Sequence, residues 1–228
     1  MNVRGSLLER IAGTTIALGR TTPTLVGVEG RSAAGKTTFA DELAATLSAR
    51  GRSIVRSSID DFHTPGHKYR SIRREYTPES YIATGYDYAG FKRSMLDPLG
   101  DGGDRCCKAA QWNSSKDQAI EDPCVQQPED AIAIVDGALL FHPLLERAWH
   151  LTIWLDIDWE TMLARAVARD IAWVKSADEV RWKYRNLWQP LHELYEREMR
   201  PKERCDIVID NRDIAAPVVL RYSPAIAT

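Results

Sequence analysis

The chain has 228 residues, of which 44% are hydrophobic and 27% are charged, a composition typical of a globular protein. Its formal net charge of −2 excludes the strongly basic surface that binds nucleic acid. No apolar run approaches the ~20 residues that cross a bilayer, and residues 1–20 lack the features of a secretory signal, so we expect a cytoplasmic protein with no membrane partner.

The apolar residues predict alternating helices and strands. A short amphipathic helix is expected within residues 1–20, where apolar side chains recur at helical spacing: Leu7, Leu8, Ile11 and Ile16. Short apolar segments, several of them rich in β-branched residues, predict strands at 24–28, 53–59, 131–135, 151–155 and 206–209.

Helical patterns lie between these strands. They predict a helix from near Lys36 to Gly51, another over about 159–170 with Asp158 as its cap, and a third over about 178–198 unless Pro190 breaks it. Because the two kinds of element alternate from end to end, we expect one α/β domain, residues 1–228, with a parallel five-stranded sheet flanked by helices.

Residues 97–130 differ from the rest, because they are rich in Gly, Asp, Pro, Ser and Gln and show weak periodicity. They predict an excursion of loops or a small hairpin.

Two of the four cysteines, Cys106 and Cys107, are adjacent, which suits neither a zinc site nor an ordinary disulfide. We therefore expect reduced thiols.

A glycine-rich motif follows the first predicted strand and opens the helix after it. Residues 30–37 fit the pattern G-x-x-x-x-G-K-[ST] of a P-loop, in which backbone N–H groups and the lysine hold nucleotide phosphates and the Ser or Thr binds Mg²⁺. The alternative is a glycine-rich turn with an incidental lysine. The predicted ATP-binding residues are Gly30, Arg31, Ser32, Ala33, Ala34, Gly35, Lys36, Thr37 and Thr38.

A P-loop needs an acidic partner for the metal at the end of another strand. Asp136 follows the predicted strand 131–135, so we expect Thr37 and Asp136 to organise Mg²⁺. The alternative is a turn aspartate, since Asp-Gly is a common turn pair.

The end of the second strand indicates a kinase. Asp60 follows strand 53–59 at the edge where open α/β sheets bind ligands, and a carboxylate there can accept the proton of an attacking hydroxyl. We expect Asp61 to be a solvated loop residue. The chain has no N-K-x-D motif of GTPases and no ABC-type signature.

Five further elements resemble, in order, those of the uridine kinase, phosphoribulokinase and pantothenate kinase group. They cover much of the chain: 60–63 (D-D-F-H), 86–91 (Y-D-Y-A-G-F), 136–141 (D-G-A-L-L-F), 163–170 (L-A-R-A-V-A-R-D) and 201–209 (P-K-E-R-C-D-I-V-I). The resemblance implies an ATP-dependent kinase in which Asp60 is the base and Asp87 holds acceptor hydroxyls. His63 and Tyr86 belong to the same elements and are candidate acceptor contacts.

Arg165 and Arg169 lie four residues apart and therefore share one helical face. Both can clamp the transferring phosphoryl group, with Arg169 stabilising its charge, if residues 165–185 form the mobile lid of such kinases. A solvated basic edge is the alternative for both arginines, and it is our expectation for Lys183.

The excursion departs from uridine kinases, whose hairpin at this point carries a Tyr and a His that read the pyrimidine. Residues 105–116 lack them, so the acceptor stays open. Trp112 is a candidate for stacking on a ring, or it packs the excursion, and Lys116 is a candidate for an anionic group. The basic segment 67–74 either is solvated or lines the acceptor pocket.

We therefore expect transfer of the γ-phosphoryl group of ATP to a hydroxyl of a nucleoside-like or sugar-containing small molecule. The alternatives are another acceptor, such as a vitamin precursor or an antibiotic, and a nucleotide-dependent switch that phosphorylates no small molecule. The oligomeric state is left open.

Overall fold

The computed structural model describes residues 2–225. Its centre is a six-stranded sheet in the order β10-β9-β8-β1-β7-β2, in which β10 alone is antiparallel to its neighbour. The strands are β1 (Thr24–Gly30), β2 (Ile54–Ser58), β7 (Ile132–Gly137), β8 (Leu151–Asp156), β9 (Ile207–Asp210) and β10 (Val218–Tyr222). The predicted parallel sheet is confirmed, and all five predicted strands belong to it.

The edge strand β10 was not predicted. Its residues are half-buried or exposed, so its sequence lacks the continuous apolar run that marked the other strands. An edge strand with one solvated side carries a weak apolar pattern for this reason.

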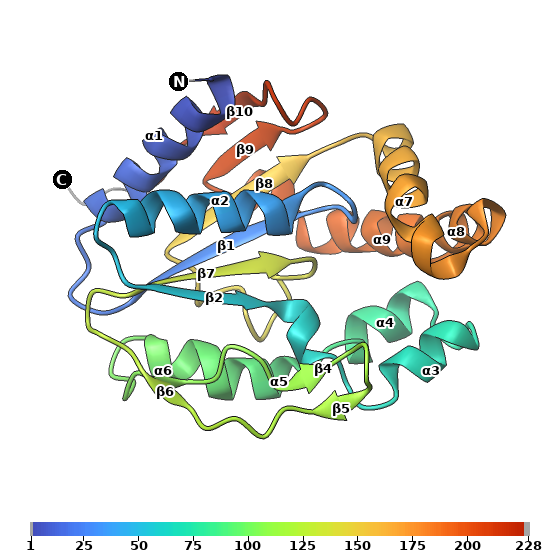
Figure 1. The fold of residues 1–228 in the computed structure, drawn as a ribbon, viewed down its shortest axis with the longest axis horizontal. Coiled ribbons are helices and arrows are strands. Elements are labelled where there is room, and N and C mark those ends of the chain that lie inside the picture. The colour runs from blue at the N-terminus through green and yellow to red at the C-terminus, as the bar shows by residue number, and fades with distance from the viewer. Residues whose placement is uncertain (1, 226–228) are drawn as a thin grey trace.

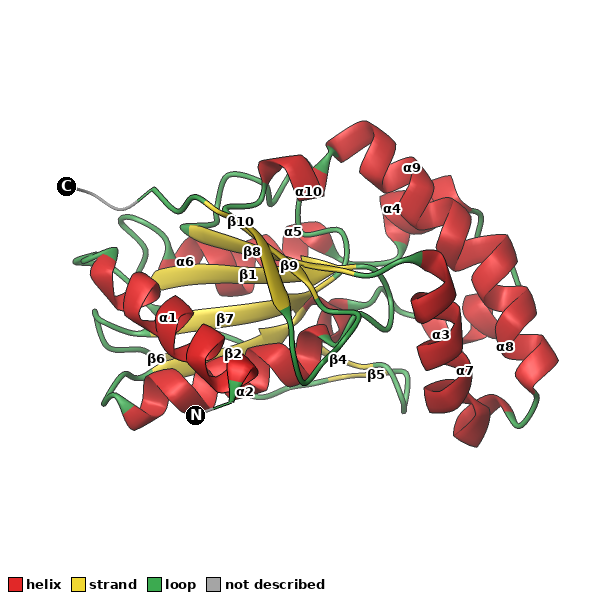
Figure 2. Cartoon of the chain, turned by 90° about the horizontal axis from the view of Figure 1, so that it is seen from above, coloured by secondary structure: helices red, strands yellow, loops and turns green. Residues whose placement is uncertain are grey.

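Helices cover both faces of the sheet (Figures 1 and 2). On one face, α1 (Val3–Ala17) packs on α2 (Lys36–Ala49), and Ile11, Phe39 and Leu43 form part of a buried cluster there. The other face carries α5 (Tyr88–Phe91), α6 (Asp97–Leu99) and α9 (Gln189–Met199), whose apolar residues form a second cluster around Trp154. Because both faces are buried, the central strands β1 and β7 are buried along their whole length.

A helical arm projects beyond the carboxyl ends of the parallel strands. It consists of α7 (Trp159–Val174), a turn at Lys175, and α8 (Ala177–Lys183), and it faces α3 (His67–Ile72) and α4 (Pro78–Thr84) (Figures 1 and 2). The predicted cap Asp158 accepts a hydrogen bond of 2.7 Å from the Thr161 amide.

The predicted helix over 178–198 is present without a break, but it contains a π-helical segment. A π-helical segment, Tyr184–Trp188, follows α8, and Pro190 then occupies the first turn of α9. Pro190 has no N–H for a carbonyl of the preceding turn, and the π-helical segment lies at that turn.

The excursion over 97–130 contains two short antiparallel pairs. They are β3 (Cys106–Cys107) with β6 (Val125–Gln126), and β4 (Trp112–Asn113) with β5 (Gln118–Ala119). The β3–β6 pairing joins Cys106 to Cys124 in a disulfide with a Cα–Cα distance of 5.3 Å. The expectation of reduced thiols is therefore wrong for this pair, because strand pairing brings together cysteines 18 residues apart. Cys107 and Cys205 are free and buried.

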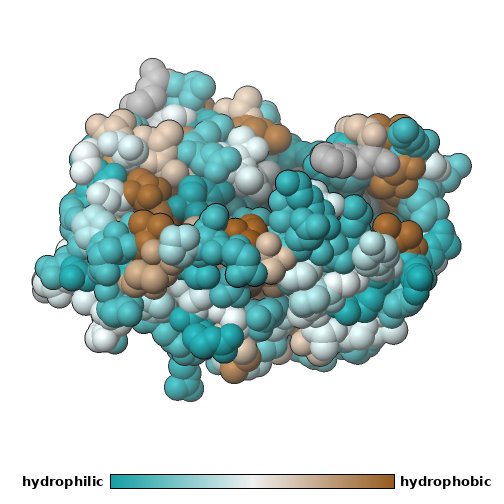
Figure 3. Space-filling model, turned by 60° about the horizontal axis from the view of Figure 1, so that its bottom comes forward, coloured by the Kyte–Doolittle hydropathy of each residue, from teal (hydrophilic) through white to brown (hydrophobic). Residues whose placement is uncertain are grey.

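Within residues 2–225, no helix combines the length and the apolar character needed to cross a bilayer. On the face shown in Figure 3, hydrophilic residues dominate and apolar ones are scattered.

Candidate active site

A cleft of about 500 Å³ lies where the carboxyl ends of β1, β7 and β2 meet the helical arm. The β-sheet register explains its position, because Asp136 of β7 pairs with Val28 of β1 and Ser58 of β2. The sequence-predicted residues that line the cleft are Ser32, Ala33, Gly35, Lys36, Thr37, Thr38, Asp60, His63, Tyr86, Asp136, Arg165 and Arg169.

The P-loop backbone uses two glycines where other residues would be strained. Gly35 has φ of 88° and begins α2, and Gly30 has φ of 152°. A Cβ atom on Gly30 would lie 2.5 Å from the Leu155 carbonyl oxygen, so the loop can pack against β8 only with glycine. The Lys36 side chain is half-buried, and its ammonium donates a hydrogen bond of 2.9 Å to the Arg31 carbonyl, across the loop.

The rear of the P-loop is held by α9. The Arg31 guanidinium donates two hydrogen bonds of 2.7 Å to the Glu196 carboxylate and stacks on Trp159, so its side chain turns away from the cleft. The Ser32 amide donates a 3.0 Å hydrogen bond to His192, whose pKa burial lowers to about 3. Together with Gly30 and Ala34, Arg31 lies outside the residues that line the cleft.

Thr37 and Asp136 together form an oxygen-rich metal candidate. The Thr37 hydroxyl donates a 2.6 Å hydrogen bond to one oxygen of Asp136, and Arg56 donates a 2.8 Å hydrogen bond to the other. Among residues 2–225, no cluster of three metal-binding side chains is present. A hydroxyl with one carboxylate fits Mg²⁺, which keeps several waters and takes its remaining ligands from phosphates.

Asp60 is held firmly at the edge of the cleft. It lies in a 3₁₀ turn, Ile59–Phe62, and one of its carboxylate oxygens accepts a 2.7 Å hydrogen bond from the Tyr86 hydroxyl. The charge of Asp60 favours the protonated forms of both Lys36 and His63, so it lies between the P-loop and the acceptor candidates. The neighbouring Asp61 was expected to be solvated, but it is half-buried, and burial raises its pKa to about 6.

Four aromatic rings form the wall beyond Asp60. His63 stacks on His67 with ring centroids 3.7 Å apart, and its second nitrogen lies 3.2 Å from the Tyr81 hydroxyl. Tyr86 packs against both His63 and Tyr81. Burial is the main cause that lowers the pKa of His63 and of His67, the latter to about 3. Both histidines are therefore neutral at physiological pH.

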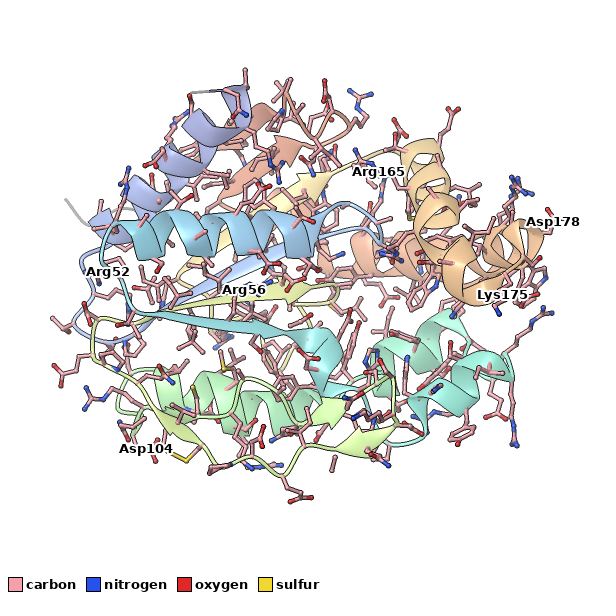
Figure 4. All side chains as sticks on the ribbon, viewed as in Figure 1. Arg52, Arg56, Asp104, Arg165, Lys175 and Asp178 are labelled. Carbon is pink, nitrogen blue, oxygen red and sulfur yellow. A yellow bond between two sulfur atoms is a disulfide. The ribbon has the colours of Figure 1, made fainter. Side chains whose placement is uncertain are left out.

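The two predicted arginines approach the cleft from α7. Arg169 donates hydrogen bonds to Asp170 at 2.6 Å and to the Tyr184 hydroxyl at 2.9 Å. Arg165 donates to the carbonyls of Asn211 and Arg212, at 2.9 and 2.7 Å, and its buried Nη1 has no partner among residues 2–225. Figure 4 shows Arg165 on the side of α7 toward the core, whereas Lys175 and Asp178 lie at the far turn of the arm.

Three predicted acceptor residues do not line the cleft. Asp87 caps α5 and accepts a 2.8 Å hydrogen bond from the Gly90 amide. Trp112 donates a 3.1 Å hydrogen bond to Asp117 within the excursion, and Lys116 is exposed on the turn between β4 and β5. The structure therefore brings neither Asp87 nor these excursion residues to the nucleotide loop.

Known proteins resemble the chain in both sequence and fold. It is 27% identical to uridine-cytidine kinase B of Dictyostelium discoideum over 82% of this chain and 74% of the relative. It is 24% identical to a uridine kinase of Clostridium perfringens over 82% of this chain and 86% of the relative. No family model matches the chain.

The fold is similar to that of a possible uridine kinase from Bacillus stearothermophilus, with a TM-score of 0.68, 16% identity, and coverage of 88% of this chain and 96% of that one. The chain is thus similar in sequence to uridine kinases and shares the fold of this P-loop protein. The D-glycerate 3-kinase of Cryptococcus neoformans has the same fold, with a TM-score of 0.59, 15% identity, and coverage of 94% and 99%.

Several residues of this kinase-like cleft were missed from the sequence. They are Tyr81, Asp170, Lys183, Tyr184 and Trp188. His67 and Ser71 also line the cleft, in agreement with one of the two alternatives given for the segment 67–74. For Lys183 a signal was present, because the helical period places it on the same face as Val180 and Leu187, which are both buried. A cation on an apolar helical face is a candidate functional group.

A buried carboxyl, Glu29, lies beneath the P-loop at the end of β1. One of its oxygens accepts a 2.9 Å hydrogen bond from the Leu139 amide, and the other has no partner among residues 2–225. Burial raises the pKa of Glu29 from 4.5 to about 7. Between these two pH values the folded state binds a proton that the unfolded state has lost, so stability falls as the pH rises through this window.

Replacing Glu29 by glutamine removes this titration while keeping the side chain's shape. The measured quantity is the difference in free energy of unfolding between the wild type and Glu29→Gln, from urea unfolding without nucleotide. We expect this difference to fall by about 3 kcal/mol between about pH 4.5 and pH 7.5. The exposed Glu121→Gln is the control for the lost charge. Parallel pH curves for wild type and Glu29→Gln would contradict the buried titration.

Proposed function

We propose that the protein transfers the γ-phosphoryl group of Mg²⁺-ATP to a hydroxyl of a small, nucleoside-like or sugar-containing metabolite. The observation that carries this proposal is the position of Asp60. Its carboxylate lines the same cleft as Lys36, Thr37 and Asp136 but belongs to the segment after β2 and not to the P-loop. A nucleotide switch needs the phosphate loop, but it has no use for a fixed carboxylate facing a pocket of this size.

In the proposed complex, the amides of the P-loop and the Lys36 ammonium bind the ATP phosphates. Thr37 and Asp136 would hold Mg²⁺, which on binding would neutralise phosphate charge. Lys36 lies near the carboxylates of Asp60, Asp136 and Glu29, each of which favours its charged form against the effect of burial. The ammonium is thereby kept available as a cation for the β and γ phosphates.

Asp60 would orient the acceptor hydroxyl and take its proton as the oxygen attacks the γ-phosphorus. The Tyr86 hydroxyl fixes one oxygen of this carboxylate and leaves the other free for the acceptor. Arg169, held by Asp170 and Tyr184, would stabilise the charge of the transferring group, and Arg165 would close the nucleotide side of the cleft.

The test is ADP production with a panel of hydroxylated acceptors. The names of similar proteins suggest uridine, cytidine and D-glycerate, and the panel adds free sugars, sugar phosphates, vitamin precursors and aminoglycoside antibiotics. We expect at least one acceptor to raise ADP formation well above the rate with water alone, and to appear as a phosphorylated product by mass spectrometry. ATP binding without acceptor-stimulated turnover across the panel would favour a nucleotide switch instead.

A further inference from the structure

The cleft has a further cationic residue besides Lys36, Arg165 and Arg169. Lys183, the last residue of α8, lines the cleft and donates a 2.8 Å hydrogen bond to the Ser71 hydroxyl of α3. His67, one turn before Ser71 on the same helix, stacks on His63, which follows Asp60 closely in the chain. Lys183 therefore lies at the acceptor end of the cleft, where the arm faces α3 (Figure 1).

The Lys183 ammonium lies 5.7 Å from the centre of the Trp188 ring, but no carboxylate of the described residues pairs with it. None of the ion pairs formed by residues 2–225 includes it, although its side chain is half-buried. The two carboxylates that favour its charged form are already engaged, since Asp170 pairs with Arg169 at 2.6 Å and Glu179 pairs with Arg74 at 2.7 Å. A desolvated cation without a carboxylate partner is costly unless a ligand supplies the negative charge.

The groups around Lys183 do not compete with such a ligand. His63 and His67 are neutral, because burial lowers the pKa of both. Arg70, whose charge also disfavours protonation of His67, is hydrogen-bonded to Tyr76 at 2.8 Å and to Thr64. The acceptor end thus offers one ammonium, a serine hydroxyl and neutral ring nitrogens, which are donors suited to a carboxylate or a phosphate.

We propose that the acceptor is an anionic hydroxylated metabolite, whose carboxylate or phosphate binds Lys183 and Ser71 while its hydroxyl is presented to Asp60. This inference rests on the proposed kinase function and adds the charge class of its substrate. It distinguishes the protein from a kinase of neutral nucleosides, for which a partly desolvated ammonium at this position would be unfavourable.

A purely mechanical role for Lys183 makes a different prediction. If the lysine only ties α8 to α3, its loss would slow turnover equally with neutral and charged acceptors. If it binds an anion, its loss affects charged acceptors alone. The ratio of kcat/KM between a charged acceptor and its neutral counterpart therefore separates the two roles.

The experiment measures ADP formation with matched acceptor pairs: glycerol and glycerate, ribose and ribose 5-phosphate, uridine and uridine 5′-monophosphate. The first pair tests a carboxylate and the other two test a phosphate. For the wild type we expect the anionic member of at least one pair to have a ~10-fold or higher kcat/KM. Lys183→Gln should lower that value by ~10–100-fold, with the KM for ATP and the rate with neutral acceptors within about twofold.

Two further variants serve as controls. Lys183→Arg keeps the positive charge and should retain most of the preference for anions. Lys175→Gln removes an equal charge from the exposed turn of the arm and should change neither rate. A wild type that prefers the neutral members, or an equal loss for both members in Lys183→Gln, would overturn the anion site.

Isothermal titration of the same compounds, in the presence of a non-hydrolysable ATP analogue, separates the two proposals. Binding of the anionic probes that Lys183→Gln abolishes, without any turnover, would sink the kinase assignment and support the anion site. Turnover of neutral acceptors alone supports the kinase and refutes the anion site. If no anionic member binds and none is turned over, the anion site is refuted as well.

Discussion

Asp60→Asn is expected to abolish acceptor-dependent ADP formation almost completely. Asparagine has the shape of aspartate and can still accept the hydrogen bond from Tyr86, but it cannot take the acceptor proton. Loss of a general base lowers kcat by ~10²–10⁴-fold. Because Asp60 is not part of the P-loop, we expect the Kd of an ATP analogue to stay within a few-fold of the wild-type value. The measurements are a coupled ADP assay and isothermal titration.

The neighbouring Asp61→Asn is the matched control, because it removes a half-buried carboxylate one residue away that does not line the cleft. We expect Asp61→Asn to keep most of the acceptor-dependent rate. If Asp60→Asn turned over the acceptor as fast as the wild type, the assignment of Asp60 as the general base would be wrong.

Lys36→Ala should weaken both nucleotide binding and turnover. The half-buried ammonium lies near the carboxyl groups of Asp60, Asp136 and Glu29, and alanine would leave the phosphate charge uncompensated there. A hydrogen bond to a charged group is worth ~1.5–3 kcal/mol, so the affinity for an ATP analogue should fall by ~10–100-fold. The rate should fall by a further ~10²–10³-fold, as expected for loss of an electrostatic contact that strengthens in the transition state.

Lys175→Ala provides the comparison, since this lysine is exposed at the far turn of the arm (Figure 4). Thermal unfolding of each variant establishes that the fold is kept. A Lys36→Ala protein that bound nucleotide and turned over at the wild-type level would refute the assignment of the phosphate cradle.

The nucleotide half of the cleft could be predicted from the sequence because its determinants are local. The P-loop conformation depends on Gly30 and Gly35 and on the start of α2, all within one short segment. The positions of Asp60 and Asp136 follow from a general rule, since the carboxyl ends of neighbouring parallel strands meet at one edge of the sheet. The register between β1, β7 and β2 brings these segments together as that rule requires.

The excursion was only partly predictable. Its loops and short strands were expected, but its pairing was not, because two-residue strands carry no periodic pattern that could specify a register. The Cys106–Cys124 disulfide depends on that register. Trp112 and Lys116 were candidates by residue type alone, and their orientation depends on how the excursion folds back on itself.

The sequence alone determined the fold class, the P-loop and the carboxylates at the ends of the strands, because these depend on neighbouring residues and on the parallel arrangement of the sheet. Only the tertiary structure decided which residues form the acceptor end. Lys183 and Ser71 are 112 residues apart, and they meet because the arm lies over α3. That meeting depends on how two distant helices are oriented in space, which the pattern of either helix by itself does not encode.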